Sequence, residues 1–470
     1  MSTVYLIGIC GTAMATLAAL LKARGFDVRG SDENIYPPMS DFLIAQGITP
    51  LSGYRVGHIT DDLDIVVIGN AVSRGNPEVE AVLDRKIRYC SLPEMLRDEF
   101  LWGSRSVVVA GTHGKTTTAS MVAWLLVEAN VDPSFFVGGI PLNFDTSFRV
   151  GDGKLFVIEG DEYDSAFFDK TAKFLKYLPD VVVVNGIEYD HADIYPDINA
   201  LRLTFTRLLR LVPRNGSVLL CADDDEALAL RDAAHSEVET FGLSAQADWR
   251  AVDIRCGHDT TAFDVFHTGA AVAHVTLPLL GAFNVRNALA AVAAGAVVGV
   301  APEVTALALG RFRGVRRRLE VCGIQRGVTV YDDFAHHPTA VRETLKALRI
   351  ANPSSRIWAV FEPRSATACR RVFQDAFAEA LGEADEVVVS SVFRSTLPEA
   401  DRLSEARLVS DLEAQGVKAR HIATVDEIVE LIATGVVPKD IVVMMSNGSF
   451  GGIQERLVER LRDDERPGER

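Results

Sequence analysis

The stretch VVVAGTHGKTTTASMVAWLL at residues 107–126 decides the fold class, because it puts an apolar strand, a glycine turn and an amphipathic helix in direct succession. Gly111 and Gly114 allow backbone N–H groups to close around phosphates, and Lys115 adds a positive charge. The hydroxyl of Thr116 can hold a magnesium ion. The stretch therefore predicts a nucleotide phosphate site between a strand and a helix.

The loop departs from the strict P-loop pattern, which places a glycine where Val109 stands and is two residues longer. A Gly-Lys-Thr tripeptide also occurs by chance, so a surface turn is the alternative interpretation. Strand, turn and helix all fall where a phosphate site needs them, and this order favours the phosphate site.

Beyond this stretch, short β-branched runs alternate with helical patterns along the chain, which is typical of parallel sheets covered by helices. We therefore predict an α/β fold in three blocks, at residues 1–104, 105–314 and 315–470, with linkers at 97–104 and 311–318. The runs expected as strands are residues 4–9, a return near Val28, and 65–68, 106–110, 155–158, 181–184, 218–220, 328–331, 357–361, 386–389 and 441–445.

Length and composition narrow the class of protein further. The 470 residues exceed what one hydrophobic core usually supports, which agrees with several domains. A formal net charge of −16 repels nucleic-acid phosphates and anionic membrane surfaces, so we expect small-molecule partners, no nucleic acid and no membrane. Six cysteines without a CxxC pair are typical of reduced thiols, and no basic, apolar leader opens the chain, so a cytoplasmic protein is expected.

At this point the sequence resembles the Mur ligases of bacterial cell-wall synthesis, whose phosphate loop reads GTxGKT/S. GTHGKTTT fits that loop, and further matches follow in the expected order: EGDEYDSAFFD at 159–169, NGIEYDHADIY at 185–195, GAFNVRNALAA at 281–291, RFRGVRRRLE at 311–320 and YDDFAHHPTA at 331–340. The resemblance implies a Rossmann-like N-terminal domain, a central P-loop ATPase-like domain and a Rossmann-like C-terminal domain. It also implies ATP and Mg²⁺ as cofactors.

Acidic and histidine side chains follow two strands of the second block. Glu159 ends the apolar run LFVIE and so faces the carboxyl edge of a sheet, and His191 follows the run VVVVN by a short loop. Magnesium prefers oxygen ligands, so residue types alone leave a structural role open for His191. The resemblance implies that Thr116, Glu159 and His191 bind magnesium. No lysine lies between residues 191 and 212, so the chain is similar to the family branch without a carbamylated lysine.

The resemblance also implies a set of nucleotide contacts. Asn284 and Asn287, one helical turn apart, are expected at the adenine, with helix capping as the alternative. Phosphoryl transfer brings anions together, so Arg317 or Arg318 is expected at the γ-phosphate. Asp332 or Asp333 is expected to contact the ribose or to position the third block, and the roles of His336 and His337 stay open, with capping and packing as alternatives. The expected cofactor-binding set is Gly111, Thr112, His113, Gly114, Lys115, Thr116, Thr117, Asn284, Asn287, Arg317, Arg318 and Asp332, and the expected catalytic set is Lys115, Glu159, His191 and Arg318.

The N-terminal GICGTAM opens a helix after a strand, so its amides are expected to bind a pyrophosphate. It is not a dinucleotide fingerprint, which would need glycines at positions 10 and 13, and this argues against a dehydrogenase. The resemblance implies a site for a UDP-sugar, formed by Gly8, Cys10, Gly11, Thr12, Met14, Asp32 and Asn70.

Within the family, SDENIYPPM, DEYDSAFFDK, EPRS and MSNGSFGGI resemble the branch that joins UDP-N-acetylmuramate to the murein tripeptide L-alanyl-γ-D-glutamyl-meso-diaminopimelate. The alternative is the branch that adds L-alanine alone, which usually opens GIGGxGM and carries ESDxSF, where this chain has Cys10 and Tyr163. A P-loop motor or transport ATPase is a third alternative, disfavoured by the asymmetric three-block layout. We expect a monomer or weak homodimer whose third block closes over ATP about a hinge at 310–319.

Overall fold

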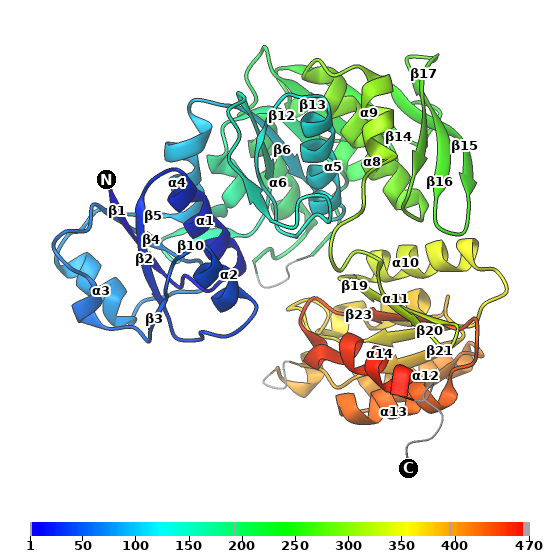
Figure 1. Ribbon diagram of the computed structural model, residues 1–470. Coiled ribbons are helices and arrows are strands. Elements are labelled where there is room, and N and C mark those ends of the chain that lie inside the picture. The colour runs from blue at the N-terminus through cyan, green and yellow to red at the C-terminus, as the bar shows by residue number, and fades with distance from the viewer. Residues whose placement is uncertain (1, 191–193, 394–396, 464–470) are drawn as a thin grey trace.

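The computed structural model of the chain describes residues 2–190, 194–393 and 397–463. Within these residues the strands form three large sheets and one two-stranded ribbon, and the three sheets follow one another along the chain. Figure 1 shows the three corresponding domains: the blue N-terminal domain, the cyan-to-green central domain and the yellow-to-red C-terminal domain. The predicted α/β fold is confirmed, while the exact domain boundaries remain predictions.

The N-terminal sheet is parallel and has the order β3-β2-β1-β4-β5. Its strands are β1 (Thr3–Ile7), β2 (Asp27–Asp32), β3 (Leu51–Ser52), β4 (Ile65–Ile68) and β5 (Tyr89–Ser91), and its helices are α1 (Thr12–Ala23), α2 (Met39–Ala45) and α3 (Pro77–Asp84). Successive strands are added first on one side of β1 and then on the other. The order therefore reverses between β1 and β4, and ligands bind open α/β sheets at such a switch point.

The central sheet has ten strands, with the order β17-β16-β15-β14-β13-β12-β6-β9-β7-β8. Its parallel part comprises β6 (Arg105–Ala110), β7 (Ser134–Phe136), β9 (Leu155–Glu159), β12 (Pro179–Val184), β13 (Ser217–Cys221) and β14 (Glu237–Gly242), and the short β8 (Phe148–Arg149) is antiparallel to β7. The predicted strands at 106–110, 155–158, 181–184 and 218–220 all lie here. These runs are apolar throughout because both faces of a parallel sheet are covered.

An antiparallel meander, which the sequence analysis did not predict, extends this sheet. It comprises β15 (Trp249–Cys256), β16 (Thr261–His267) and β17 (Ala270–Leu277). Residues of β16 alternate between buried and half-buried, as expected for a sheet with one solvated face. The predicted strands of the second block therefore omitted this segment.

The helix after the phosphate loop, α5 (Lys115–Glu128), is buried on nearly every side. Helices α8 (Ala282–Val297) and α9 (Pro302–Leu309) pack against it and also contact strands of the sheet. The expectation of an amphipathic helix was therefore wrong, because tertiary packing covers the face that would otherwise meet solvent.

The C-terminal sheet has the order β18-β19-β23-β20-β21-β22. Its strands are β18 (Glu320–Gln325), β19 (Val328–Asp333), β20 (Ile357–Phe361), β21 (Glu386–Val389), β22 (Lys418–His421) and β23 (Ile441–Met445), and all are parallel except β18. One face is covered by α10 (Pro338–Ala351), α11 (Gln374–Leu381) and α12 (Glu405–Ala414), and the other by α13 (Val425–Gly435) and α14 (Ile453–Asp463).

The joints between the domains differ in packing. One hydrophobic cluster runs through both the N-terminal and the central domain, whereas the C-terminal domain has two further clusters, one of which also includes Leu280 of the central domain. The first joint is not a loose linker, because a π-helical turn at Arg97–Leu101 continues α4 (Leu92–Leu96) and buries Phe100 and Leu101. The second joint carries positive φ angles at Gly314 (88°), Arg317 (61°) and Leu319 (50°). The second joint therefore connects bodies that share less of their cores than the first two domains do.

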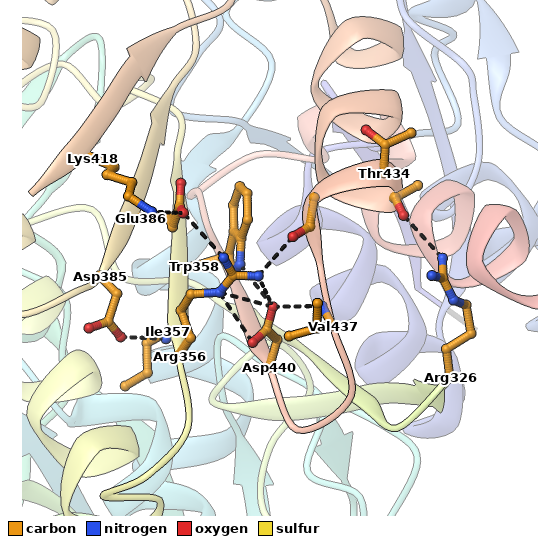
Figure 2. A network of polar contacts seen from close by, with 12 residues as sticks. Arg326, Arg356, Ile357, Trp358, Asp385, Glu386, Lys418, Thr434, Val437 and Asp440 are labelled. Carbon is orange, nitrogen blue, oxygen red and sulfur yellow. Dashed lines mark hydrogen bonds and ion pairs between the residues drawn. The ribbon is translucent and has the colours of Figure 1, made fainter.

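A polar network closes the amino edge of the C-terminal sheet. Figure 2 shows the Arg356 guanidinium between the carboxylates of Asp440 and Glu386, at 2.5 and 3.3 Å. Asp440 also accepts hydrogen bonds from the Trp358 indole at 3.3 Å and the Val437 N–H at 2.9 Å. The network links the starts of β20 and β21 to the turn before β23.

No helix in the described parts of the chain is long and apolar enough to cross a membrane. All six cysteines are free.

Candidate active site

The phosphate loop lies at the carboxyl edge of the central sheet, between β6 and α5. Gly111 has φ 122°, and a Cβ there would lie 2.9 Å from the Gly186 carbonyl oxygen. Gly114, with φ 74°, caps α5, and a Cβ there would lie 2.3 Å from Oδ1 of Asn287. Both positions therefore exclude any side chain. The first helical turn, with Thr116 and Thr117 buried, opens toward the sheet edge and offers free N–H groups to an anion.

Lys115 is held by the loop and by one carboxylate. Its ammonium donates to the Gly111 carbonyl at 2.7 Å and lies 2.9 and 3.1 Å from the two carboxylate oxygens of Glu162. Burial acts to lower the pKa of Lys115, but the charges of Glu162, Asp161 and Glu159 more than offset it and raise the pKa. The lysine is therefore a fixed cation beside the loop.

Two oxygen donors face each other next to this lysine. The Thr116 hydroxyl donates to Oε1 of Glu159 at 2.9 Å, and Oε2 of Glu159 accepts from the Gly138 N–H at 2.7 Å. Burial, together with the charge of Asp161, raises the pKa of Glu159. A buried carboxylate beside a hydroxyl is a donor set that magnesium prefers, so these residues fit the expected ion. The third expected ligand, His191, lies outside the described residues.

A second segment, directly after β12, closes against the loop. Thr112 exchanges hydrogen bonds between its hydroxyl and the backbone of Glu188, at 2.9 and 3.0 Å. Oε2 of Glu188 lies 2.6 Å from Nε2 of His113 and 3.5 Å from Nδ1 of His337, which belongs to the C-terminal domain. Oε1 of Glu188 accepts from the Thr339 hydroxyl at 2.9 Å. Glu188 thus joins the loop to the start of α10.

Charge and burial set the protonation of this group. Burial acts to raise the pKa of Glu188, but the hydrogen bond and charge of His113 more than offset it, so the pKa falls to about 2. Burial, helped by the charge of His113, lowers the pKa of His337 to about 4. At neutral pH Glu188 is therefore a carboxylate and His337 is neutral.

The two asparagines of α8 lie behind the loop. Asn284 donates to the Leu280 carbonyl at 2.8 Å, and Asn287 donates to Oδ1 of Asn284 at 3.2 Å. Oδ1 of Asn287 accepts from Thr118 at 3.2 Å and from Asn185 at 3.5 Å. The structure brings both asparagines to the phosphate loop as expected, and their contact with adenine remains a prediction.

The two hinge arginines point in different directions. Nη2 of Arg318 lies 3.4 Å from the Thr116 hydroxyl, so this guanidinium reaches the phosphate loop. Arg317 instead holds the C-terminal domain together: Nε lies 3.1 Å from Asp332, and Nη2 donates to the carbonyls of Ser446 and Gly448 at 2.7 and 2.5 Å. Of the two, Arg318 is placed to meet a phosphate.

A separate cavity of about 1040 Å³ opens at the carboxyl edge of the N-terminal sheet. It is lined by all seven residues expected at the UDP-sugar: Gly8, Cys10, Gly11, Thr12, Met14, Asp32 and Asn70. Asp32 accepts hydrogen bonds from the N–H groups of Cys10 at 2.9 Å and Asn34 at 3.0 Å, and so fixes the turn before α1. Ser165 and Lys173 of the central domain also line the cavity, which therefore lies between the N-terminal and central domains.

Sequence reasoning gave no role to Asn185, Glu188 or Gly138. Asn185 and Glu188 directly follow β12, so the rule that sites lie at the carboxyl ends of parallel strands could have identified both. No pattern in the sequence marks Gly138, because its contact with Glu159 joins residues 21 positions apart.

Three family descriptions match the chain in succession. "Mur ligase family, catalytic domain" covers residues 3–100, "Mur ligase middle domain" covers residues 109–295, and "Mur ligase, glutamate ligase domain" covers residues 317–448. The three matches follow the three sheets in order.

Curated relatives match over nearly the whole chain. The UDP-N-acetylmuramate–L-alanyl-γ-D-glutamyl-meso-2,6-diaminoheptandioate ligase of Escherichia coli K12 is 42% identical over 97% of this chain and 98% of that protein. The UDP-N-acetylmuramate–L-alanine ligase of Salinibacter ruber is 36% identical over 98% of this chain and 95% of that protein.

Solved structures give a complementary result. A murein peptide ligase from Psychrobacter arcticus 273-4 is 34% identical, with a TM-score of 0.74 over 98% of this chain and 99% of that one. A UDP-N-acetylmuramate–alanine ligase from Thermotoga maritima is 25% identical, with a TM-score of 0.82 over 99% of this chain and 100% of that one. A TM-score over several domains also depends on how they are arranged, so sequence identity is the better guide to the nearer branch.

Proposed function

Because the chain belongs to the Mur ligase family, we propose that it uses ATP to join UDP-N-acetylmuramate to L-alanyl-γ-D-glutamyl-meso-diaminopimelate, in murein recycling. The observation that carries the choice of peptide is the identity of 42% to a ligase named for that substrate, against 36% to a ligase named for L-alanine. The second reaction, addition of L-alanine to the same sugar, is the alternative.

The first step joins the muramate carboxylate to the γ-phosphoryl group of ATP, which gives an acyl phosphate and releases ADP. The transfer brings anions together, so cations aimed at the phosphates are what it needs. Lys115 and the N–H groups of the loop and of α5 bind the phosphates, and Arg318 reaches the same place from the hinge. Magnesium, held by Thr116 and Glu159, supplies further neutralisation of the phosphate charge when bound.

In the second step the amine of the tripeptide attacks the acyl carbon, the amide bond forms and inorganic phosphate leaves. Water would hydrolyse the acyl phosphate, so the C-terminal domain has to cover the site before transfer. The contacts of Thr339 and His337 with Glu188 hold the domain against the phosphate loop and support this arrangement. Release of product then requires the domain to turn about residues 311–319.

The remaining features of the proposal concern partners and compartment. The N-terminal cavity takes the UDP part of the sugar nucleotide, because the first turn of α1 lines it and offers its N–H groups to a diphosphate. The net charge of −16 and the free thiols support a cytoplasmic enzyme that acts on small molecules, as a monomer or weak homodimer.

The test is ligation of purified protein with Mg-ATP and UDP-N-acetylmuramate, offered either the tripeptide or L-alanine. We expect a UDP-linked product, and stoichiometric phosphate release, with the tripeptide. Product with L-alanine alone would select the alternative, and phosphate release without any acceptor would indicate a plain ATPase.

A further inference from the structure

We propose that His113, Glu188 and His337 form a site for one zinc-class divalent cation between the phosphate loop and the C-terminal domain. One ligand atom from each residue lies within 4.8 Å of the other two. This site is distinct from the proposed magnesium site, which consists of oxygen donors on Thr116 and Glu159. The inference goes beyond the ligase reaction, which does not require it.

The donor chemistry favours a transition ion. Two imidazoles and one carboxylate are a set that binds Zn²⁺ in three positions of a tetrahedron and leaves the fourth open. Magnesium takes oxygen ligands and keeps much of its water, so it competes poorly for imidazole nitrogen. The two proposed sites therefore differ in which metal they select.

The two distances from Glu188 need little adjustment. Bonds of about 2.0–2.1 Å to a tetrahedral ion place ligand atoms roughly 3.4 Å apart. Oε2 of Glu188 already lies 3.5 Å from Nδ1 of His337, while its 2.6 Å contact with Nε2 of His113 has to widen by less than an ångström. The proton in the hydrogen bond between His113 and Glu188 would be released when the ion binds.

The three side chains are positioned by other contacts. The Thr339 hydroxyl holds Oε1 of Glu188 and leaves Oε2 facing both imidazoles, and Thr112 fixes the backbone of Glu188. His337 is 6% exposed, and its Nδ1 accepts a hydrogen bond from the Thr339 N–H at 3.3 Å. An ion bound at Nδ1 would replace that bond, and the hydrogen of the neutral ring would stay on Nε2, which is buried without a hydrogen-bond partner among the described residues.

The ion would connect the central domain to the C-terminal domain. His113 and Glu188 belong to the central domain, while His337 caps the first turn of α10, which faces the central domain in Figure 1. A bound cation would replace a weak contact between the domains by metal bonds. It would thereby hold the C-terminal domain against the phosphate loop.

The test measures metal binding by the full chain after treatment with a chelator, in excess Mg²⁺. Zinc affinity is read by competition with a chromophoric chelator, and Co²⁺ serves as a second probe because four-coordinate cobalt absorbs strongly in the visible range. The variants are Glu188→Gln and His337→Gln, each checked for folding by circular dichroism. The matched control is His274→Gln, which removes a histidine paired with a single carboxylate, Asp264, at 2.6 Å.

We expect one zinc per parent chain, at least about tenfold weaker zinc binding in both variants, and cobalt absorption lost in the variants and kept in the control. Parent protein that binds no zinc in excess Mg²⁺ would overturn the proposal, as would variants that bind zinc as the parent does. Neither outcome bears on ligation, which is assayed without zinc.

Discussion

The ammonium of Lys115 lies 2.9 Å from the carboxylate of Glu162, a side chain that is 1% exposed. The Glu162 backbone is fixed as well, because its carbonyl accepts a hydrogen bond from the Tyr195 hydroxyl at 2.6 Å. A phosphate bound in the loop would compete with Glu162 for the same cation. In the absence of nucleotide, Glu162 therefore forms the ion pair with Lys115 that a phosphate would otherwise form.

Replacing Glu162 by glutamine should destabilise the nucleotide-free protein by about 3 kcal/mol, because it leaves the buried Lys115 charge without its carboxylate. Bound ATP supplies a substitute anion, so saturating Mg-ATP should raise the melting temperature of the variant more than that of the parent. Thermal unfolding with and without Mg-ATP measures both effects. An equal rise in variant and parent would contradict this role of Glu162.

Replacing Lys115 by alanine should lower kcat for ligation about 10²–10³-fold, because the fixed cation beside the transferred phosphoryl group is lost. The measurement is product formation at saturating substrates. The control is Lys170→Ala, since Lys170 is 65% exposed and pairs with Asp164. A Lys115 variant with the parent's kcat would remove the central argument for the phosphate site.

The two neighbouring hinge arginines should separate into distinct effects. Arg318→Ala should lower kcat with little change in stability, because Arg318 reaches Thr116. Arg317→Ala should instead cost about 1–3 kcal/mol of stability, because it removes the guanidinium that pairs with Asp332 and donates to two backbone carbonyls. Urea unfolding and steady-state kinetics on both variants distinguish these outcomes, and the opposite pattern would exchange the roles.

Much of the fold follows from the sequence, because parallel strands that are covered on both faces appear in the sequence as continuous runs of β-branched residues. The predicted strands at 181–184 and 441–445 are examples, and they lie within β12 and β23 of the structure. The meander from Trp249 to Leu277 escaped prediction because its alternating pattern is weak and half exposed. Burial of α5 depends on α8 and α9, which come more than 150 residues later, so no local pattern could reveal it.

The candidate site also has a part that the sequence predicts and a part that only the structure shows. Gly8, Gly111 and Gly114 have backbone conformations that few other residues adopt, and their motifs identify them locally. Glu188 meets His113 and His337 only through the tertiary fold, at sequence separations of 75 and 149 positions. Motifs thus locate the loops of this site, while contacts between the loops need the structure.

Acid should weaken the C-terminal domain through His337. The pKa of His337 falls from 6.5 to about 4 in the folded chain, so below pH 6.5 the unfolded chain binds a proton that the folded chain refuses. Stability from this group is complete above pH 6.5 and is lost as the pH falls toward 4. Urea unfolding from pH 7 to 4, with a chelator present, should show a shallower decline for His337→Gln than for the parent. If the stability of the variant and that of the parent fell equally with pH, His337 would not be the source of the acid sensitivity.

The network in Figure 2 should govern stability and leave chemistry untouched. Asp440 is 3% exposed and accepts from Arg356, Trp358 and Val437, so Asp440→Asn removes the charge that organises all three donors. We expect a loss of about 1–3 kcal/mol in urea unfolding.

The matched control for this change is Asp426→Asn, because Asp426 is 79% exposed in its pair with Arg456. Breaking an exposed pair should cost less than about 1 kcal/mol. Both variants should keep the parent's kcat when folded, since the network lies at the amino ends of β20 and β21 while the phosphate-facing residues of this domain lie at the opposite edge of the sheet. A fall in kcat for Asp440→Asn without loss of folded protein would show that this edge communicates with the site.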